Sequence, residues 1–361
     1  MDKRIILAVA GSGKTYHISN DFSQTEKVIL ISYTNANVAN IRKEVFKRND
    51  INIENIKFMT FDSFVYNVLL RPFEPLTNFK IISSGVNIHT NPEYDTRKPE
   101  YKAITDYKHY FCTHNEYFIG RLSKYFLKQN SKFKKTVMNT LKNYCDAIYF
   151  DEFQDYNSND FKILKYVIEK FEGKVIAVGD INQSLLTPKK HRENGHSKPF
   201  NEIFTTQDLI SKGKFSKEIS IDEDSLKYSR RVAPQICKFI RDNMGIDIYP
   251  EKQKEGNIFV VEDIKKINNL LMNDKIKKLV WNKRVVDGLF NNYVNWKYSK
   301  GDTYEEICII LTKELSNLDS WNNIKSSSTK NALYVALTRA KGNVYLIKKG
   351  DFDKWKSEYI N

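Results

Sequence analysis

The sequence predicts an α/β protein built from two domains, each a doubly wound parallel sheet. Short apolar runs alternate with helical patterns, and each run ends in polar or glycine residues, as buried strands of a parallel sheet do. The expected strands of the first set are residues 5–9, 28–33, 58–61, 147–150 and 175–178. The second set comprises residues 218–221, 257–261, 278–281, 307–311 and 344–347. Helical patterns lie between the strands, for example over residues 37–46 and 161–171.

The length and a break between the two strand sets predict two domains. A chain of 361 residues exceeds one typical core, and residues 188–199 are rich in Lys, His, Gly and Pro, which indicates a loop. We expect a first domain over residues 1–195 and a second over residues 196–361. Residues 69–142 break the alternation and predict a mainly helical insertion. Their aromatics and lysines fit either a solvated helical face or a basic surface over a nucleic-acid channel.

Composition narrows the class of protein. Lys and Arg outnumber Asp and Glu by 58 to 44, and the resulting net charge of +14 gives weak support to a polyanionic partner. No run of apolar residues is long enough to span a membrane, and the N-terminus lacks a secretory pattern, so we expect a cytoplasmic protein without a membrane partner. The 4 cysteines form no CxxC pair, which argues against a zinc ribbon and fits a reducing compartment.

A phosphate-binding loop is the sharpest motif. Residues 8–15, AVAGSGKT, follow an expected strand and precede an expected helix, which is the context a P-loop needs. Glycines let backbone N–H groups wrap the phosphates, the lysine reaches the β and γ phosphates, and the hydroxyl binds Mg²⁺. The predicted nucleotide-binding residues are Ala10, Gly11, Ser12, Gly13, Lys14 and Thr15, and Thr15 is also a predicted metal ligand.

Two further strand ends carry polar residues suited to hydrolysis. Residues 147–150 are apolar and deliver Asp151 and Glu152 to a strand end, beside the P-loop in such folds. Asp151 would bind Mg²⁺ and the nucleotide, and Glu152 would deprotonate the attacking water. The strand at residues 175–178 leads to Gln183, whose amide would sense the γ-phosphate.

Together these elements resemble the UvrD/Rep-like branch of the superfamily 1 DNA helicases, in a compact form. DEFQD at residues 151–155 resembles the DExQD box of that branch, and GDINQ at residues 179–183 resembles its GDxxQ box. Further segments match in the family's order, namely YTNANVA at 33–39, TFDSF at 60–64, LKYSRR at 226–231, SKGDTYE at 299–305 and YVALTRAK at 334–341.

The resemblance implies two RecA-like P-loop NTPase lobes that use ATP and Mg²⁺. It implies that Arg231 and Arg339 reach the γ-phosphate and that Glu305 contacts the nucleotide. If the register of the first arginine motif shifts by one, Arg230 takes the place of Arg231. Single-stranded DNA is the implied partner, with RNA not excluded, and the implied contacts are Thr34, Asn35, Thr60, Ser63, Phe64, Ser299 and Lys300.

The chain departs from the family pattern in four places. Asp62 stands where histidine is usual, and no upstream glutamine motif precedes Ala8. Residues 282–298 leave no room for the extra domain of larger relatives, and residues 184–190 lack an aromatic. These departures bear on nucleotide choice, on strand separation and on base stacking.

We therefore predict an ATP-driven helicase or translocase on single-stranded DNA. The first alternative is a nucleic-acid-sensing ATPase switch that does not unwind and works with a partner such as a nuclease, which the short segment 282–298 favours. A binding module without activity conflicts with the presence of Lys14, Glu152 and Arg339. A small-molecule kinase conflicts with the motifs of the second domain.

Overall fold

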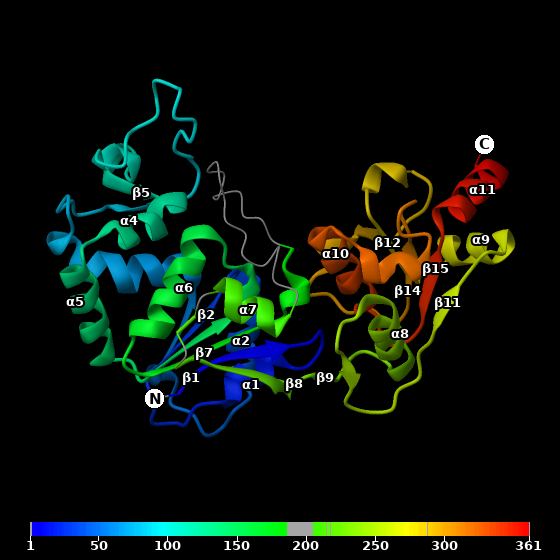
Figure 1. The fold of residues 1–361 in the computed structure, drawn as a ribbon, viewed down its shortest axis with the longest axis horizontal. Helices are drawn as coiled ribbons and strands as arrows, with labels where there is room; N and C mark the ends of the chain where they lie inside the picture. Colours follow the sequence, from blue (N-terminus) through cyan, green and yellow to red (C-terminus); the bar gives the residue numbers. More distant parts are fainter. Residues whose placement is uncertain (1, 186–204, 214, 217, 287, 361) are drawn as a thin grey trace. The chain divides into compact units, whose positions relative to one another are not determined.

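The computed structural model describes residues 2–185, 205–213, 215–216, 218–286 and 288–360, and the loop expected at 188–199 lies outside them (Figure 1). The chain forms two compact units. The first unit comprises Met1–Ile6, Lys14–Gly179 and Leu186–Asp222, and the second comprises Leu7–Gly13, Asp180–Leu185 and Glu223–Asn361. Across the described ranges, no helix has both the length and the apolar character that crossing a membrane requires.

A six-stranded sheet has the strand order β3-β2-β6-β7-β1-β8. The pairs β3–β2, β2–β6 and β6–β7 are parallel, with Ser32 opposite Thr60 and Ile31 opposite Phe150. The carboxyl ends of β3, β2 and β6 therefore lie next to one another. The strands are β1 (Lys3–Ala8), β2 (Val28–Ser32), β3 (Ile56–Thr60), β6 (Ala147–Asp151), β7 (Lys174–Gly179) and β8 (Ser220–Leu226).

The position of β8 corrects the sequence-based assignment. Residues 218–221 are expected in the second domain, but β8 pairs at the edge of the six-stranded sheet beside β1. The Oγ of Ser220 lies 3.4 Å from the carbonyl of Lys3, and the N–H of Val9 donates to the carbonyl of Leu226 at 3.0 Å. The strand is mostly polar, and charged side chains on an edge strand discourage pairing with a further strand.

Helices of the first unit pack on this sheet as the alternation predicts. Helices α1 and α2 contact each other, α2 packs on β2 and β3, and α6 packs on β7 and α4. The side chains of Thr34 and Asn130 cap α2 and α5 by accepting from backbone N–H groups of the first turn. The helices are α1 (Lys14–Asn20), α2 (Asn35–Val45), α3 (Phe61–Phe64), α4 (Leu122–Lys128), α5 (Ser131–Lys142), α6 (Ser158–Lys170) and α7 (Thr206–Gly213).

The insertion at 69–142 is less helical than predicted. Only α4 and α5 are α-helices there, while residues 77–115 are mainly irregular, with short 3₁₀ turns and a small parallel sheet of β4 (Gly85–Asn87) and β5 (Glu116–Phe118). Four prolines interrupt residues 72–99, which removes backbone donors that a helix needs. Packed aromatic rings hold this part together instead, with Tyr125 in contact with Tyr110 and Tyr117.

A five-stranded, all-parallel sheet forms the centre of the second unit, in the order β11-β15-β14-β12-β13. Successive residues of β14 face opposite sides. Ile307 and Ile309 enter one core cluster with α8 and α10, whereas Cys308 and Ile310 enter another with α9 and α11. Helices therefore cover both faces of this sheet, which explains its uninterrupted apolar strands.

The remaining bounds complete the second unit (Figure 1). Its sheet contains β11 (Ile258–Val260), β12 (Lys277–Val280), β13 (Tyr293–Asn295), β14 (Ile307–Ile310) and β15 (Val344–Ile347). Its helices are α8 (Pro234–Met244), α9 (Ile264–Met272), α10 (Ser327–Leu337) and α11 (Lys349–Tyr359), and β9 (Tyr228–Ser229) pairs with β10 (Tyr249–Pro250). The α/β class with two parallel sheets, six- and five-stranded, is confirmed.

Candidate nucleotide site and nucleic-acid surface

The P-loop turn joins β1 to α1, as its sequence predicts. Gly11 and Gly13 have φ values of +74° and +90°, a backbone region that residues with a Cβ atom rarely adopt. Ala10 and Ser12 are buried, and the Oγ of Ser12 has no hydrogen-bond partner within the described residues. The turn thus has the backbone shape of a phosphate cradle.

At the carboxyl end of β6, Asp151 and Glu152 form the acidic strand end together with Lys14 at the start of α1. The Nζ of Lys14 lies 3.6 Å from Oε1 of Glu152, and both side chains are largely buried. Asp151 is 3% exposed, and burial with the neighbouring Glu152 carboxylate raises the pKa of Asp151. This strand end belongs wholly to the first unit.

The oxygens around Asp151 fit a divalent cation. Ser32, at the end of the neighbouring strand β2, donates its hydroxyl to Oδ2 of Asp151 at 3.3 Å. Oδ1 of Asp151 is buried without a hydrogen-bond partner among the described residues. A buried carboxylate oxygen needs a partner, and Mg²⁺ prefers carboxylate and hydroxyl oxygens. Thr15, one residue beyond Lys14 in α1, offers a further hydroxyl.

Glu152 has a left-handed backbone, with φ of 54° and ψ of 46°. This conformation costs about 1–3 kcal/mol for a residue with a side chain, so the surrounding structure must hold it. Gln154 donates its amide to Oε2 of Glu152. Gln154 is fully buried against Gly179, where an added Cβ would lie 2.2 Å from Oε1 of Gln154. Gln154 therefore holds the side chain of Glu152, the candidate catalytic base, in place. This role was not predicted from the sequence.

The second unit brings Arg231 and Arg339 together beside the P-loop turn. A Cβ added to Gly11 would lie 2.7 Å from the Cβ of Arg231. Burial, together with the positive charge of Arg339, lowers the pKa of Arg231, although a guanidinium remains charged at neutral pH. Nη1 of Arg231 donates to Oγ1 of Thr303 at 3.2 Å. We call Arg231, Arg339 and the Ala10–Gly11 turn beside them the arginine cluster.

Arg339 donates to several neutral oxygens. It is 2% exposed, and its Nε donates to the carbonyl of Val335 at 2.9 Å. Its Nη1 and Nη2 donate to the carbonyl of Asp302 at 3.3 Å and to Oγ1 of Thr338 at 3.2 Å. The partly buried Arg231 and the buried Arg339 lie close enough for one charge to lower the pKa of the other, and an anion would stabilise such a pair.

Ser229 and Tyr334 attach the P-loop turn to the arginine cluster, and the sequence reasoning missed both. The hydroxyl of Ser229 donates to the carbonyl of Ala10 at 2.7 Å and accepts from the N–H of Val232 at 3.0 Å. The N–H of Ala10 donates to the hydroxyl of Tyr334 at 3.0 Å. Both residues lie within the quoted motifs LKYSRR and YVALTRAK, so the signal was in the sequence.

The structure separates Arg230 from Arg231. The side chain of Arg230 is 48% exposed and pairs with Glu251 at 3.0 Å, and its guanidinium lies near Gly13. Gln183 is buried and donates to Oδ2 of Asp180 at 3.0 Å. Glu305 is 79% exposed and pairs with Lys341 at 2.6 Å, so it lies on the surface of the second unit.

The predicted nucleic-acid contacts of the first unit follow the neighbouring strands β2 and β3. Thr34 caps α2 by accepting from the N–H of Asn37 at 3.2 Å, and Asn35 is exposed at the first position of that helix. Thr60 caps α3 and donates to Oγ of Ser63 at 3.0 Å. Because Ser32 and Thr60 are paired across the strands, these four residues follow adjacent strand ends.

Two of the predicted contacts are not on the surface. Phe64 is fully buried, with its ring centroid 6.0 Å from that of Phe150. Ser299 is also fully buried and donates to the carbonyl of Trp296 at 2.7 Å. The Phe64 ring packs into the core beneath its strand, and the Ser299 hydroxyl is used within its own loop. Both residues therefore support the local backbone and do not expose a binding group. Lys300 is partly exposed.

This chain is similar in part of its sequence to a known protein family and in its fold to solved helicase structures. Residues 83–187 match the UvrD/REP helicase N-terminal domain. No curated protein matches the chain. The solved structure of arterivirus nonstructural protein 10, a helicase in complex with DNA, is 13% identical with a TM-score of 0.50, covering 98% of this chain and 62% of its own. This likeness shows the fold.

Two other structures are similar to the chain. The free arterivirus helicase is 14% identical with a TM-score of 0.48, covering 98% of this chain and 61% of its own. The PRRSV helicase is 12% identical with a TM-score of 0.46, covering 96% of this chain and 52% of its own. The chain therefore spans less than two thirds of these viral helicases, and the UvrD/REP match lies in the part that carries the insertion and β6.

Proposed function

We propose that this protein is a nucleic-acid-dependent ATPase, a UvrD-like superfamily 1 helicase or translocase that moves along single-stranded DNA by hydrolysing ATP. The observation that carries the proposal is the partly buried Arg231 and the buried Arg339 beside the P-loop turn, because guanidinium groups next to a phosphate cradle suit a nucleoside triphosphate. The DNA in the structure of the arterivirus helicase supports a nucleic-acid partner.

In this proposal Lys14 and the P-loop turn bind the phosphates, and Thr15 and Asp151 hold Mg²⁺, which neutralises charge on the phosphates. Glu152 takes a proton from the attacking water, and Arg231 and Arg339 stabilise the charge that develops on the transferred group. Gln183 senses the γ-phosphate, and Glu305 contacts the nucleotide. The proposal also includes two RecA-like lobes, with the insertion at 69–142 in the first.

Phosphate release from ATP, with and without single-stranded DNA, tests this function in the wild type and in Glu152→Gln. We expect strong stimulation by DNA in the wild type and a loss of about 10²–10⁴-fold in the variant, since it removes a general base. Activity that the variant loses but that DNA does not change would contradict an autonomous translocase, and RNA or a protein partner would then be tested as the trigger.

A switch that does not unwind, working with a partner such as a nuclease, is the second candidate. The short connection between β12 and β13 favours it, because only one 3₁₀ turn is described between these strands, at Lys283–Val285. A strand-displacement assay separates the two candidates. A switch hydrolyses ATP on single strands without releasing the annealed strand, whereas a helicase releases it.

A further inference from the structure

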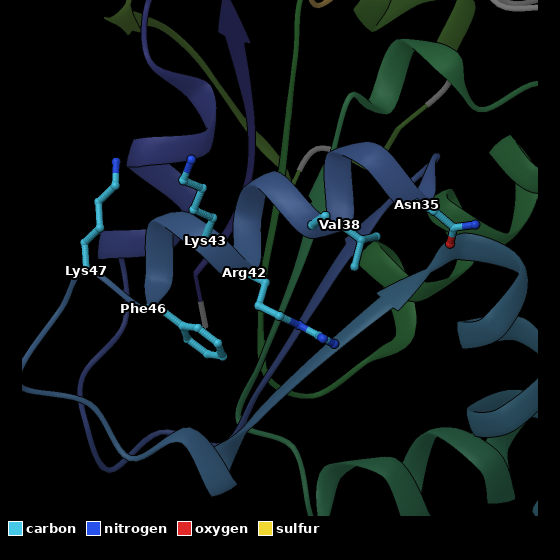
Figure 2. A pocket seen from close by; sticks show the side chains of 7 residues that line it. Asn35, Val38, Arg42, Lys43, Phe46 and Lys47 are labelled. Carbon is cyan, nitrogen blue, oxygen red and sulfur yellow. The ribbon is translucent and has the colours of Figure 1, made fainter.

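One face of α2 forms a groove on the first unit, which we call the α2 groove. Its lining side chains are Asn35, Val38, Arg42, Lys43, Phe46 and Lys47. In Figure 2, Arg42 and Phe46 reach to one side of the helix, and Lys43 and Lys47 extend from the other. The groove is thus bordered by cations, with an aromatic ring on one side.

The spacing of these residues puts them on the solvent-exposed half of the helix. They recur at intervals of three and four, whereas Ile41 and Val45 are buried. No acidic residue lines the groove in the described part of the chain. Lys47 shares an ion pair with Glu44, so Arg42 and Lys43 supply most of the uncompensated charge.

Phe46 presents a ring to solvent in a fixed position. It is 56% exposed, and its centroid lies 6.1 Å from that of Phe58 at an interplanar angle of 88°. The guanidinium of Arg42 lies over the ring of Phe58, 5.2 Å from its centroid. A positioned aromatic beside cations is the combination that proteins use to stack bases and neutralise the backbone of single strands.

The groove begins where the proposed DNA contacts end. Asn35 belongs to both, and Thr34 caps the same helix. The helix has 11 residues and is therefore about 16 Å long at ~1.5 Å per residue. This length matches about five stacked nucleotides at ~3.4 Å each.

We infer that the α2 groove is a further binding site for single-stranded DNA, which extends the contacts at Thr34 and Asn35 along the helix. Arg42 and Lys43 bind phosphates, and Phe46 stacks on a base. The inference rests on the proposed function, since it assumes that single-stranded DNA reaches the ends of β2 and β3. It adds a segment of surface that the motif residues do not include.

The main test removes the charges of the groove without disturbing the helix. Arg42→Gln/Lys43→Gln/Lys47→Gln keeps helix propensity because glutamine is close to lysine and arginine in this respect. The matched control is Lys265→Gln/Lys266→Gln/Lys275→Gln, which removes three exposed lysines of the second unit. Circular dichroism verifies that each variant is folded. If the triple variant is unfolded, the single variant Lys43→Glu is used for the same measurement.

The probe is fluorescein-labelled oligothymidylate of about 20 nucleotides, longer than the roughly 4–16 nucleotides that a single binding surface covers. Its affinity is measured at several salt concentrations. Loss of the two phosphate contacts should reduce the magnitude of the slope of log K against log salt by about 1.4, since each contributes ~0.7. Between about 50 and 200 mM salt, the wild type should then lose roughly sevenfold more affinity than the groove variant. The control should keep the wild-type slope.

Phe46→Leu tests stacking, because leucine keeps the apolar packing but lacks the ring. We expect at least about fivefold weaker binding of the long oligothymidylate. With a series of shorter oligothymidylates, the length at which affinity stops rising should fall by about five nucleotides in the charge variant.

An unchanged salt slope and an unchanged limiting length in the groove variant would overturn the inference while the wild type still binds and hydrolyses ATP. If the wild type itself shows neither binding to oligothymidylate nor stimulation by it, the proposed function fails, and the groove proposal fails with it. The two failures are therefore distinguishable in the same experiment.

Discussion

The acidic strand end of the first unit and the arginine cluster of the second unit handle buried charge in opposite ways. In the acidic strand end, charges of opposite sign compensate each other, with Lys14 3.6 Å from Glu152. In the arginine cluster, Arg231 and Arg339 carry the same charge, and they donate to the hydroxyl of Thr303 and the carbonyl of Val335, respectively. The first arrangement is compensated in part, because Oδ1 of Asp151 remains for a cation. The second places two like charges close enough to lower the pKa of Arg231, so we expect it to respond most to nucleotide.

The largest expected effect concerns the arginine cluster. Arg231→Ala and Arg339→Ala should each lower ATP turnover by about 10³–10⁵-fold, because an arginine that neutralises transition-state charge contributes that much. Phosphate release at saturating ATP and DNA measures the loss. Arg230→Ala, at a side chain 48% exposed and paired with Glu251, is the matched control and should retain most activity. The reverse result would show that Arg230 is the catalytic arginine.

A second prediction concerns the close approach between Gly11 and Arg231. Gly11→Ala should destabilise the protein by about 2–5 kcal/mol, through backbone strain and overpacking against the Cβ of Arg231 at 2.7 Å. Gly288 has nearly the same φ, +75°, with nothing within 4 Å, so Gly288→Ala isolates the strain at about 1–2 kcal/mol. Denaturant unfolding measures both. Equal losses would mean that the P-loop turn is not packed against the arginine.

A smaller effect is expected at the acidic strand end. Ser32→Ala removes the hydroxyl that orients Asp151 and should weaken Mg²⁺ binding by about 10–100-fold. The Mg²⁺ concentration for half-maximal ATPase measures this change. Ser123→Ala removes a similar bond, from a buried serine to Asp160 at 2.5 Å, and should leave that concentration unchanged. If both variants shift it equally, the effect is one of stability and not of metal binding.

The smallest effect is expected for Tyr334→Phe. The variant deletes the hydroxyl that accepts from the N–H of Ala10 and leaves that donor buried, which should cost about 1–2 kcal/mol of unfolding free energy. Thermal unfolding measures the loss, and the downward shift should be reduced when ATP is present. A variant as stable as the wild type would show that the turn does not depend on this contact.

The sequence predicted the strands that carry the site because those strands are buried on both faces. Strand β6 and strand β7 are almost entirely apolar, and their bounds agree with the prediction to within one residue. The strand β8 was assigned to the wrong sheet, since a polar edge strand of sequence SIDEDSL carries no signal for its partner. Tertiary packing decides which distant strands pair. The local pattern of apolar residues does not indicate the partner.

The site was predicted in part for a similar reason. A motif names the residue types that chemistry requires. Asp151 at the end of β6 and Arg339 in the arginine cluster are both buried. A motif does not say which of its members point outward, and so Phe64 was expected on the surface although it packs in the core. Supporting residues such as Gln154 act through other side chains, and their function depends on contacts that only the fold reveals.

The strand order has a consequence for synthesis on the ribosome. Strand β1 is made before both of its neighbours in the sheet, β7, which ends at Gly179, and β8, which ends at Leu226. At about 5–20 residues per second, the nascent chain waits roughly ten to forty seconds before both neighbours of β1 exist. During that time an apolar strand and the loop that follows it have no sheet to join. A chaperone that binds short apolar segments would therefore have time to bind β1 before its neighbours are made.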